Sequence, residues 1–372
     1  MKKVKKALPY LFFMLMGGVC GVVIVRYLTA ALPADLPAGR YFFLLFLFLL
    51  EMYLAIFLQI VIHESGHLLF GLLTGYRFSS FRIGNVMWIK EGGKIRLRRM
   101  SIAGTGGQCL LIPPDLKDGK CPYVLYNMGG SLMNLITAAV FGLIGFFLGD
   151  GSPLSPLFWM LAIIGVVFAL MNGIPMRMGG VDNDGYNAWS LGENAEALQA
   201  FWLQMKVNEQ ISNGVRLKDM PEEWFAMPSE EGMQNSMIAA IAVFACNRLV
   251  DQGRFAEADA QMTELLARKS GIIGLYRNLL TVDQVYCELV GENRAERIEK
   301  LWDKDFEKFL KSMKTFPSVI RTEYTYALLY EQDRAKAEKI SEKFEKVAKK
   351  YPHPNEIRAE RELMDYAEGR AV

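Results

Sequence analysis

Four stretches of the chain are almost continuously apolar: residues 8–31, 41–74, 123–148 and 154–175. Each reaches the roughly 20 residues that a helix needs to cross a bilayer. From Asn187 onward the chain is charged and amphipathic, without a comparable apolar run. The pattern therefore predicts an all-α polytopic membrane domain with about four transmembrane helices over residues 1–189. An α-helical soluble domain is expected over residues 190–372.

The first apolar stretch has two interpretations. MKKVKK before it and the small residues of TAALPA near its end are typical of a cleaved secretory signal. The apolar stretch is longer than the core of a usual signal, which favours an uncleaved first helix.

Residues 76–112 have the pattern of strands rather than of a helix. FRIGNVMWIK and KIRLRRM alternate apolar and polar residues around the glycine-containing turn EGG, which predicts a β-hairpin. The apolar stretch that follows contains Gly104 and Gly106, and it reads either as a flexible loop or as a further β segment. The membrane domain is thus expected to carry a small β insertion.

The soluble domain shows three helix-turn-helix joints, at Gly253, Gly291 and Asp333, about 40 residues apart. This spacing lies within the range of helical repeats and predicts a tetratricopeptide-like array, with an irregular helical bundle as the alternative. An array would offer a concave surface to a protein partner. The alternative role is a cap that stabilises the membrane domain.

The distribution of charged residues predicts how the chain is oriented in the membrane, and it says little about binding partners. The net charge of +2 gives no reason to expect nucleic acid as a partner. Lysines occupy the N-terminus, and nine Lys and Arg residues lie in the loop from Gly75 to Pro122. The connections at 32–40 and 149–153 contain only Arg40. Because basic loops stay in the cytosol, we expect a multi-pass protein of the cell membrane with both termini cytoplasmic.

The second apolar stretch contains His63, Glu64 and His67 in the sequence HESGH. Ionisable residues at membrane depth are costly and indicate a functional site. Positions four apart share one helix face, so the two imidazoles can bind one metal ion. This is the HExxH arrangement, in which the histidines hold zinc and the glutamate acts as general base. The alternative is a chance match, with both histidines hydrogen-bonded inside a helix bundle.

A catalytic zinc site also needs a third protein ligand. The fourth apolar stretch ends in MNGIPMRMGGVDNDGYN, which offers Asp182 and Asp184. In an extended segment, residues two apart point to the same side, so either carboxylate could reach the metal. Gly185 follows Asp184 and would permit backbone geometry that carries this carboxylate toward the metal before a helix starts.

HExxH in a membrane helix, GSLMN in the next and NGIPMRMGGVDNDG after the last together resemble the site-2 protease family of intramembrane zinc metalloproteases. The resemblance covers about residues 41–190. It implies one Zn²⁺ per chain, held by His63, His67 and Asp184, with Glu64 as general base. It also implies that Asn134 and Asn172 lie near the scissile bond as oxyanion donors.

The resemblance further implies that the segment containing Gly104 and Gly106 is a re-entrant β-loop that holds the substrate in extended form. The sequence departs from the family pattern in two places. Ser131 replaces a proline, and a few residues separate Asp184 further from Pro175 than is usual. The longer spacing keeps Asp182 open as the third ligand.

Three functions compete at this point. The resemblance implies an intramembrane zinc metalloendopeptidase that hydrolyses peptide bonds within or next to transmembrane segments of membrane proteins or signal peptides. The alternative is a non-catalytic, metal-stabilised membrane scaffold that recruits partners through its helical domain, although the intact Glu64 argues against it. A membrane peptidase of another HExxH class would need a glutamate as third ligand, and the Asp184-Gly185 pair argues against that function.

Overall fold

The computed structural model describes residues 37–102, 105–149, 152, 154–178 and 181–371, together with positions 14, 17, 18 and 21. Apart from those four positions, the first predicted membrane segment lies outside the described residues, and so does Gly104. The chain divides into two compact units. The first comprises residues 1–74 and 122–190, and the second comprises residues 75–121 and 191–372. The β segment therefore groups with the C-terminal helices.

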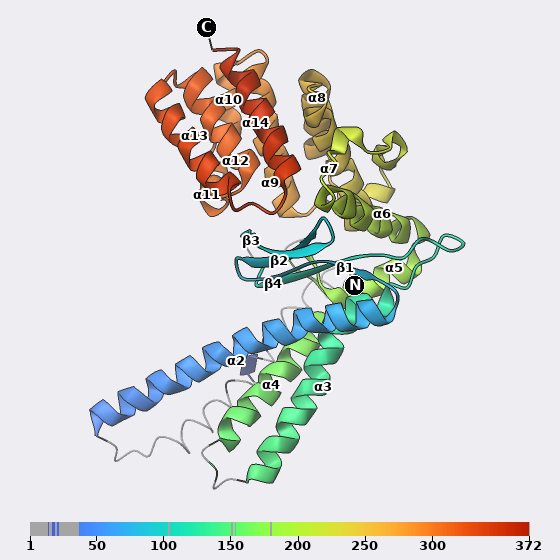
Figure 1. Cartoon of the computed structure of the whole chain (residues 1–372), viewed down its shortest axis with the longest axis vertical. Coiled ribbons are helices and arrows are strands. Elements are labelled where there is room, and N and C mark those ends of the chain that lie inside the picture. Colours follow the sequence, from blue (N-terminus) through green and yellow to red (C-terminus); the bar gives the residue numbers. More distant parts are fainter. Residues whose placement is uncertain are drawn as a thin grey trace. The chain divides into compact units, whose positions relative to one another are not determined.

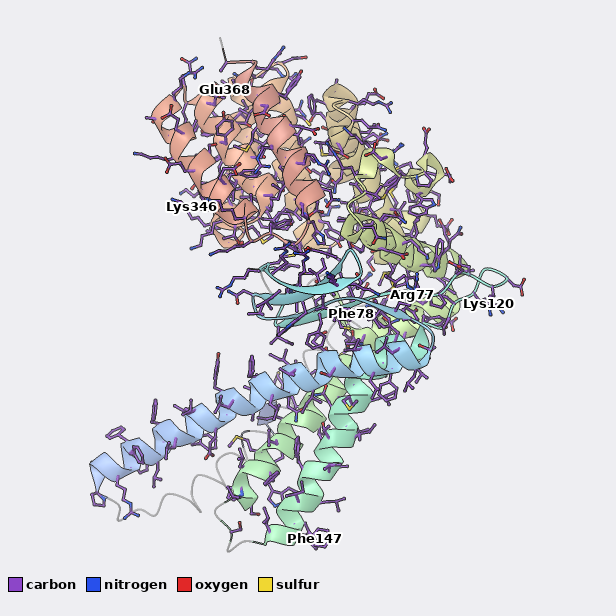
Figure 2. The ribbon with its side chains drawn as sticks, viewed as in Figure 1. Arg77, Phe78, Lys120, Phe147, Lys346 and Glu368 are labelled. Carbon is purple, nitrogen blue, oxygen red and sulfur yellow. The ribbon has the colours of Figure 1, made fainter. Side chains whose placement is uncertain are left out.

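Three long helices make up most of the described part of the first unit: α2 (Ala38–Leu73), α3 (Val124–Leu148) and α4 (Ser155–Gly173). Each is long and apolar enough to cross a membrane (Figure 1). Large apolar side chains point outward, and Figure 2 shows Phe147 near the end of α3, where it is 81% exposed. An exposed apolar surface of this extent is typical of a helix bundle that faces lipid.

Small residues bring the three helices together. A Cβ atom added to Gly66 of α2 would lie 2.3 Å from the carbonyl oxygen of Gly129 in α3, and one added to Gly129 would lie 2.6 Å from that of Gly66. A Cβ atom added to Gly165 of α4 would lie 3.0 Å from the Cβ atom of Ala138 in α3. Membrane helices commonly pack through such small residues, because dispersion contacts replace the hydrophobic driving force there.

After α4 the chain turns back through a short hairpin into α5 (Asp184–Glu193). The hairpin pairs β5 (Arg177–Met178) with β6 (Val181–Asp182). Asn183 holds this turn, because its side-chain amide donates to the carbonyls of Met171 and Ile174. Its Oδ1 accepts from the backbone N–H groups of Met176 and Tyr186. One side chain thus fixes the end of α4 against the start of α5.

The second unit contains a four-stranded antiparallel sheet in the order β3-β2-β1-β4. Its strands are β1 (Arg77–Ile83), β2 (Val86–Glu91), β3 (Lys94–Arg99) and β4 (Gly107–Ile112). The predicted hairpin is confirmed, since β2 and β3 pair around a turn in which Gly92 and Gly93 have positive φ. Within this unit the sheet joins the helices through hydrogen bonds from Arg99 N to Lys350 O and from Trp202 Nε1 to Pro114 O.

The rest of the second unit is helical. Its α-helices are α6 (Ala195–Ser212), α7 (Ser236–Asp251), α8 (Phe255–Ala267), α9 (Gly274–Val290), α10 (Ala295–Leu301), α11 (Lys304–Ser312), α12 (Pro317–Thr325), α13 (Arg334–Ala348) and α14 (Pro354–Glu368). Helices end or begin at the three predicted joints, where Gly253 has a positive φ and Asp333 caps α13 with its side chain. A tetratricopeptide-like array stays a prediction.

Candidate metal centre

The two histidines of HESGH lie on one face near the C-terminal end of α2, and Asp184 faces them from the first residue of α5. His63 Nε2 and His67 Nε2 are 3.2 Å apart. Asp184 Oδ2 lies 3.1 Å from His63 Nε2 and 3.4 Å from His67 Nε2. Both histidines are buried, with 8% of each exposed. These three side chains form a group that could hold a metal ion.

A chain of hydrogen bonds assigns the proton on His63. Gln59 Nε2 donates to the backbone carbonyl of Leu161 in α4, so Gln59 Oε1 is an acceptor. Asn134 Nδ2 donates to this Oε1 and to the backbone oxygen of Gln59. Asn134 Oδ1 is therefore left to accept from His63 Nδ1, at 2.8 Å. Because Nδ1 carries the proton, the Nε2 of His63 presents a free lone pair.

His67 has the same tautomer for a simpler reason. Its Nδ1 lies 2.7 Å from the backbone carbonyl oxygen of Tyr126, which can only accept a hydrogen bond. Its Nε2 therefore also presents a lone pair. With both imidazoles neutral, three acceptor atoms meet at one point, an arrangement that a shared cation stabilises. Partners of this kind on the second ring nitrogen are typical of histidines that bind metal.

The spacing of the three atoms suits tetrahedral coordination. Ligand atoms about 2.0–2.1 Å from a tetrahedral ion lie about 3.3–3.4 Å from one another. The three observed separations, 3.1, 3.2 and 3.4 Å, fall near this value. Two imidazoles and one carboxylate form a donor set that suits Zn²⁺ as well as other divalent first-row metals.

Two glycines make this geometry sterically possible. A Cβ atom on Gly130 of α3 would lie 2.5–2.7 Å from three atoms of the His63 imidazole. A Cβ atom on Gly185 would lie 2.2 Å from the carbonyl oxygen of Gly173. Contacts this short do not occur for a real side chain, so an alanine at either position would displace a metal-ligand segment. The glycine after Asp184 therefore lets α5 approach the end of α4.

Asp182 lies outside the group of three ligands. Arg177 donates to both of its carboxylate oxygens, over 2.5 and 3.0 Å, and this pair closes the β5–β6 hairpin. The residues that lengthen the spacing between Pro175 and Asp184 thus form a hairpin of their own. Asp184, as the first residue of α5, is the carboxylate that faces the histidines.

The other predicted site residues have different surroundings. Glu64 is buried on α2, and its carboxylate acts electrostatically on His67. The amide of Asn134 is engaged by Gln59 and His63. Asn172 donates to the carbonyl of Phe168 within α4. Gly106 belongs to the second unit, where its carbonyl accepts from Gly84 N.

Spacing along the chain indicates one of the residues that support the metal centre and says little about the others. Gln59 precedes His63 by one helical turn, and this spacing places it on the metal-binding face. GSLMN includes Gly130, but no local pattern shows that this glycine packs against His63, or that Asn183 and the carbonyl of Tyr126 support the site.

Comparison of the chain with family models, with curated proteins and with solved structures gave no match.

Proposed function

We propose that this protein is an intramembrane zinc metalloendopeptidase, similar to the site-2 protease family, which cleaves peptide bonds within or beside transmembrane segments. One observation carries the proposal. Three buried acceptor atoms, from His63, His67 and Asp184, converge near the end of a helix of membrane-spanning length, with Glu64 beside them. A metal site in this location serves substrates that themselves lie in the bilayer.

In this proposal His63, His67 and Asp184 hold one Zn²⁺. When bound, zinc supplies Lewis acidity, which lowers the pKa of water to about 7 and polarises the scissile carbonyl. Glu64 accepts the proton of the attacking water and then transfers it to the leaving amine as the C–N bond breaks. The buried location keeps Glu64 away from bulk water and therefore favours transfer to the substrate.

The location proposed for the protein follows from its apolar helices and from the basic loop between two of them. α2, α3 and α4 cross the cell membrane, and the basic residues around the β segment hold the loop between α2 and α3 in the cytosol. Together with the crossing that the sequence predicts for residues 8–31, the chain crosses the membrane four times, so both termini are cytoplasmic. The metal ligands lie near the cytosolic end of α2, so cleavage takes place near the cytosolic face of the bilayer.

The test compares Glu64→Gln with the wild-type chain. Glutamine cannot accept the proton but leaves all three ligands in place, so the variant should bind zinc normally and release no membrane peptides. Glu51→Gln on the same helix makes the same change about three turns away and serves as the control. The readouts are zinc content of the purified proteins and mass spectrometry of peptides released from membranes of cells that express each variant. Wild-type release by the Glu64 variant would overturn the protease mechanism in favour of a scaffold.

A further inference from the structure

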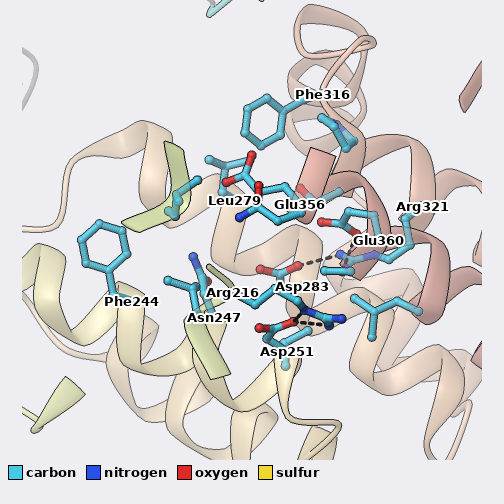
Figure 3. A pocket seen from close by; sticks show the side chains of 18 of the residues that line it. Arg216, Phe244, Asn247, Asp251, Leu279, Asp283, Phe316, Arg321, Glu356 and Glu360 are labelled. Atoms are coloured by element: carbon cyan, nitrogen blue, oxygen red, sulfur yellow. Dashed lines mark hydrogen bonds and ion pairs between the residues drawn. The ribbon is translucent and has the colours of Figure 1, made fainter. Parts of the chain in front are cut away.

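The second unit contains a cavity of about 250 Å³ that plays no part in the metal centre. It is lined by α7, α9, α12, α14 and the segment that follows α6. Phe244, Leu279 and Phe316 contribute apolar wall, whereas the deeper part is charged (Figure 3). Pockets for drug-sized ligands usually have volumes of about 300–1,000 Å³. This cavity is therefore suited to a single side chain.

The two arginines of the cavity are already neutralised. Arg321, which is 1% exposed, pairs with Asp283 over 2.6 Å and with Glu360 over 3.3 Å. Arg216 pairs with Asp251 over 2.5 Å and with Glu362 over 2.6 Å. Each guanidinium group thus lies between two carboxylates. Neither is free to attract an anion into the cavity.

The lining carries an excess of negative charge. Four carboxylates (Asp251, Asp283, Glu356 and Glu360) face two guanidinium groups (Arg216 and Arg321), an excess of two when Glu360 is ionised. Glu356 has no basic partner among the described residues, and it accepts a hydrogen bond from the Tyr351 hydroxyl. The free negative charge of the cavity is therefore located on α14.

A buried acceptor in the lining also lacks a donor. Asn355 is 2% exposed and uses its Nδ2 to donate to the carbonyl of Val215. Its Oδ1 is buried and has no hydrogen-bond partner within the described part of the chain. An unsatisfied buried acceptor costs about 1–3 kcal/mol. The complementary ligand has hydrogen-bond donors, a positive charge and an apolar stem.

We propose that this cavity binds one lysine or arginine side chain presented by a peptide segment. The methylene groups of that side chain lie along Phe316 and Leu279, and its cationic head pairs with Glu356. A long basic side chain has this division between an apolar stem and a charged tip. The cavity is thus a recognition site for a basic peptide.

The source of the peptide rests on the proposed function. Cytosolic flanks of transmembrane segments are rich in Lys and Arg, so a membrane-protein substrate would carry a suitable side chain next to its spanning helix. Binding of a peptide needs no cleavage and no zinc. A negative result in the binding experiment would therefore not contradict the protease mechanism. A negative result in the cleavage experiment would not contradict the proposal that the cavity binds a basic side chain.

Glu360 adds a dependence on pH. Burial raises its pKa to about 7, and Asp283 on α9, Asp251 on α7 and Glu356 on α14 itself add to the rise while Arg321 opposes it. Tyr286 on α9, Arg216 in the segment after α6 and Tyr351 just before α14 also lie in this region. A bound cation favours the ionised carboxylate, so peptide affinity should increase between pH 6 and pH 8.

The experiment measures fluorescence anisotropy of a fluorescein-labelled peptide, Ala-Leu-Ala-Lys-Ala-Leu-Ala, with the full-length protein in detergent. A second peptide carries norleucine in place of lysine. The lysine peptide should bind about tenfold more tightly, as expected for a partly buried charge pair. Glu356→Gln should remove this preference. Glu342→Gln on α13, an equal change of charge outside the cavity, should preserve it.

Leu279→Lys provides a second variant, because its own ammonium group would occupy the cavity and exclude the peptide. Equal binding of the two peptides, no binding of either, or an unchanged preference in Glu356→Gln would each overturn the proposal. If n-butylammonium displaced the peptide at the peptide's own concentration, a free small cation would bind as well as the peptide does. That result would contradict the proposal that the cavity recognises a peptide.

Discussion

Asn134 Oδ1 accepts a hydrogen bond from His63 Nδ1 over 2.8 Å, and this contact links α3 to a candidate metal ligand of α2. The resemblance to site-2 proteases had suggested Asn134 as an oxyanion donor. Both hydrogens of its amide nitrogen are directed to Gln59, however, one to the backbone oxygen and one to Oε1. Its geometry is therefore that of a residue which positions His63.

Replacing Asn134 by leucine should weaken zinc binding. The variant keeps the size of the side chain but leaves His63 Nδ1 without an acceptor, and such partners are worth about 10–100-fold in metal affinity. Competitive titration with a zinc chelator measures this directly. Asn172→Leu on α4 is the matched control and should bind zinc like the wild type. Full zinc affinity with lost cleavage in Asn134→Leu would instead favour the oxyanion role.

Gly130→Ala should disrupt the metal centre by steric contact alone. The added methyl group would lie 2.5–2.7 Å from the His63 ring, so the imidazole or α3 must move. We expect a loss of at least tenfold in zinc affinity while the helices remain folded by circular dichroism. Gly142→Ala lies on the same helix, where the added atom would meet Ala162 and Trp159 at an ordinary 3.8–3.9 Å. Equal zinc affinity of the two variants would show that His63 tolerates the crowding.

The elements that the sequence predicted well are those with a local pattern. The apolar runs around α2, α3 and α4, the EGG hairpin and the pair His63 and His67 each depend on spacing within one segment. The polar chain from Leu161 through Gln59 and Asn134 to His63 joins residues up to 102 positions apart. The sequence singled out His63 and Asn134, but only the packing of three helices shows that Gln59 and Asn134 together position His63.

The choice of the third metal ligand also could not be made from the sequence alone. Two aspartates two positions apart are equivalent in an extended segment, and the sequence alone left both open. Arg177 separates them, because it holds Asp182 in the hairpin and so leaves Asp184 to start α5. The sequence argument linked Gly185 to backbone geometry. This glycine is helical, and a Cβ atom added to it would lie 2.2 Å from Gly173 O, which indicates a need for close packing instead.

Glu360→Gln should change how the stability of the second unit depends on pH. The pKa of Glu360 rises from 4.5 to about 7 on burial, so the folded state binds a proton that the unfolded state releases. The stability from this group is full below pH 4.5 and falls as pH rises toward 7, by up to about 3 kcal/mol. Glutamine mimics the protonated form.

The variant should therefore unfold at about the wild-type temperature at pH 5 and at a higher temperature at pH 8. Thermal unfolding of the full-length protein, followed by tryptophan fluorescence at both pH values, measures the difference. Glu342→Gln on α13 is the control and should follow the wild type. A Glu360 variant that is less stable than the wild type at pH 8 would show that the ion pair with Arg321 outweighs the cost of burial.

Asp184→Ala and Asp182→Ala should have opposite effects on metal content. Asp184 Oδ2 lies within 3.4 Å of both histidine nitrogens, so its removal leaves two ligands and should abolish most zinc binding. Asp182 contacts Arg177, so its removal loosens the hairpin while all three ligands remain. Arg177→Ala breaks the same ion pair from the other side and should match Asp182→Ala in retaining zinc. The zinc content of the purified wild type and of the three variants tells which aspartate binds the metal. Loss of zinc in the Asp182 variant together with its retention in the Asp184 variant would exchange the two assignments.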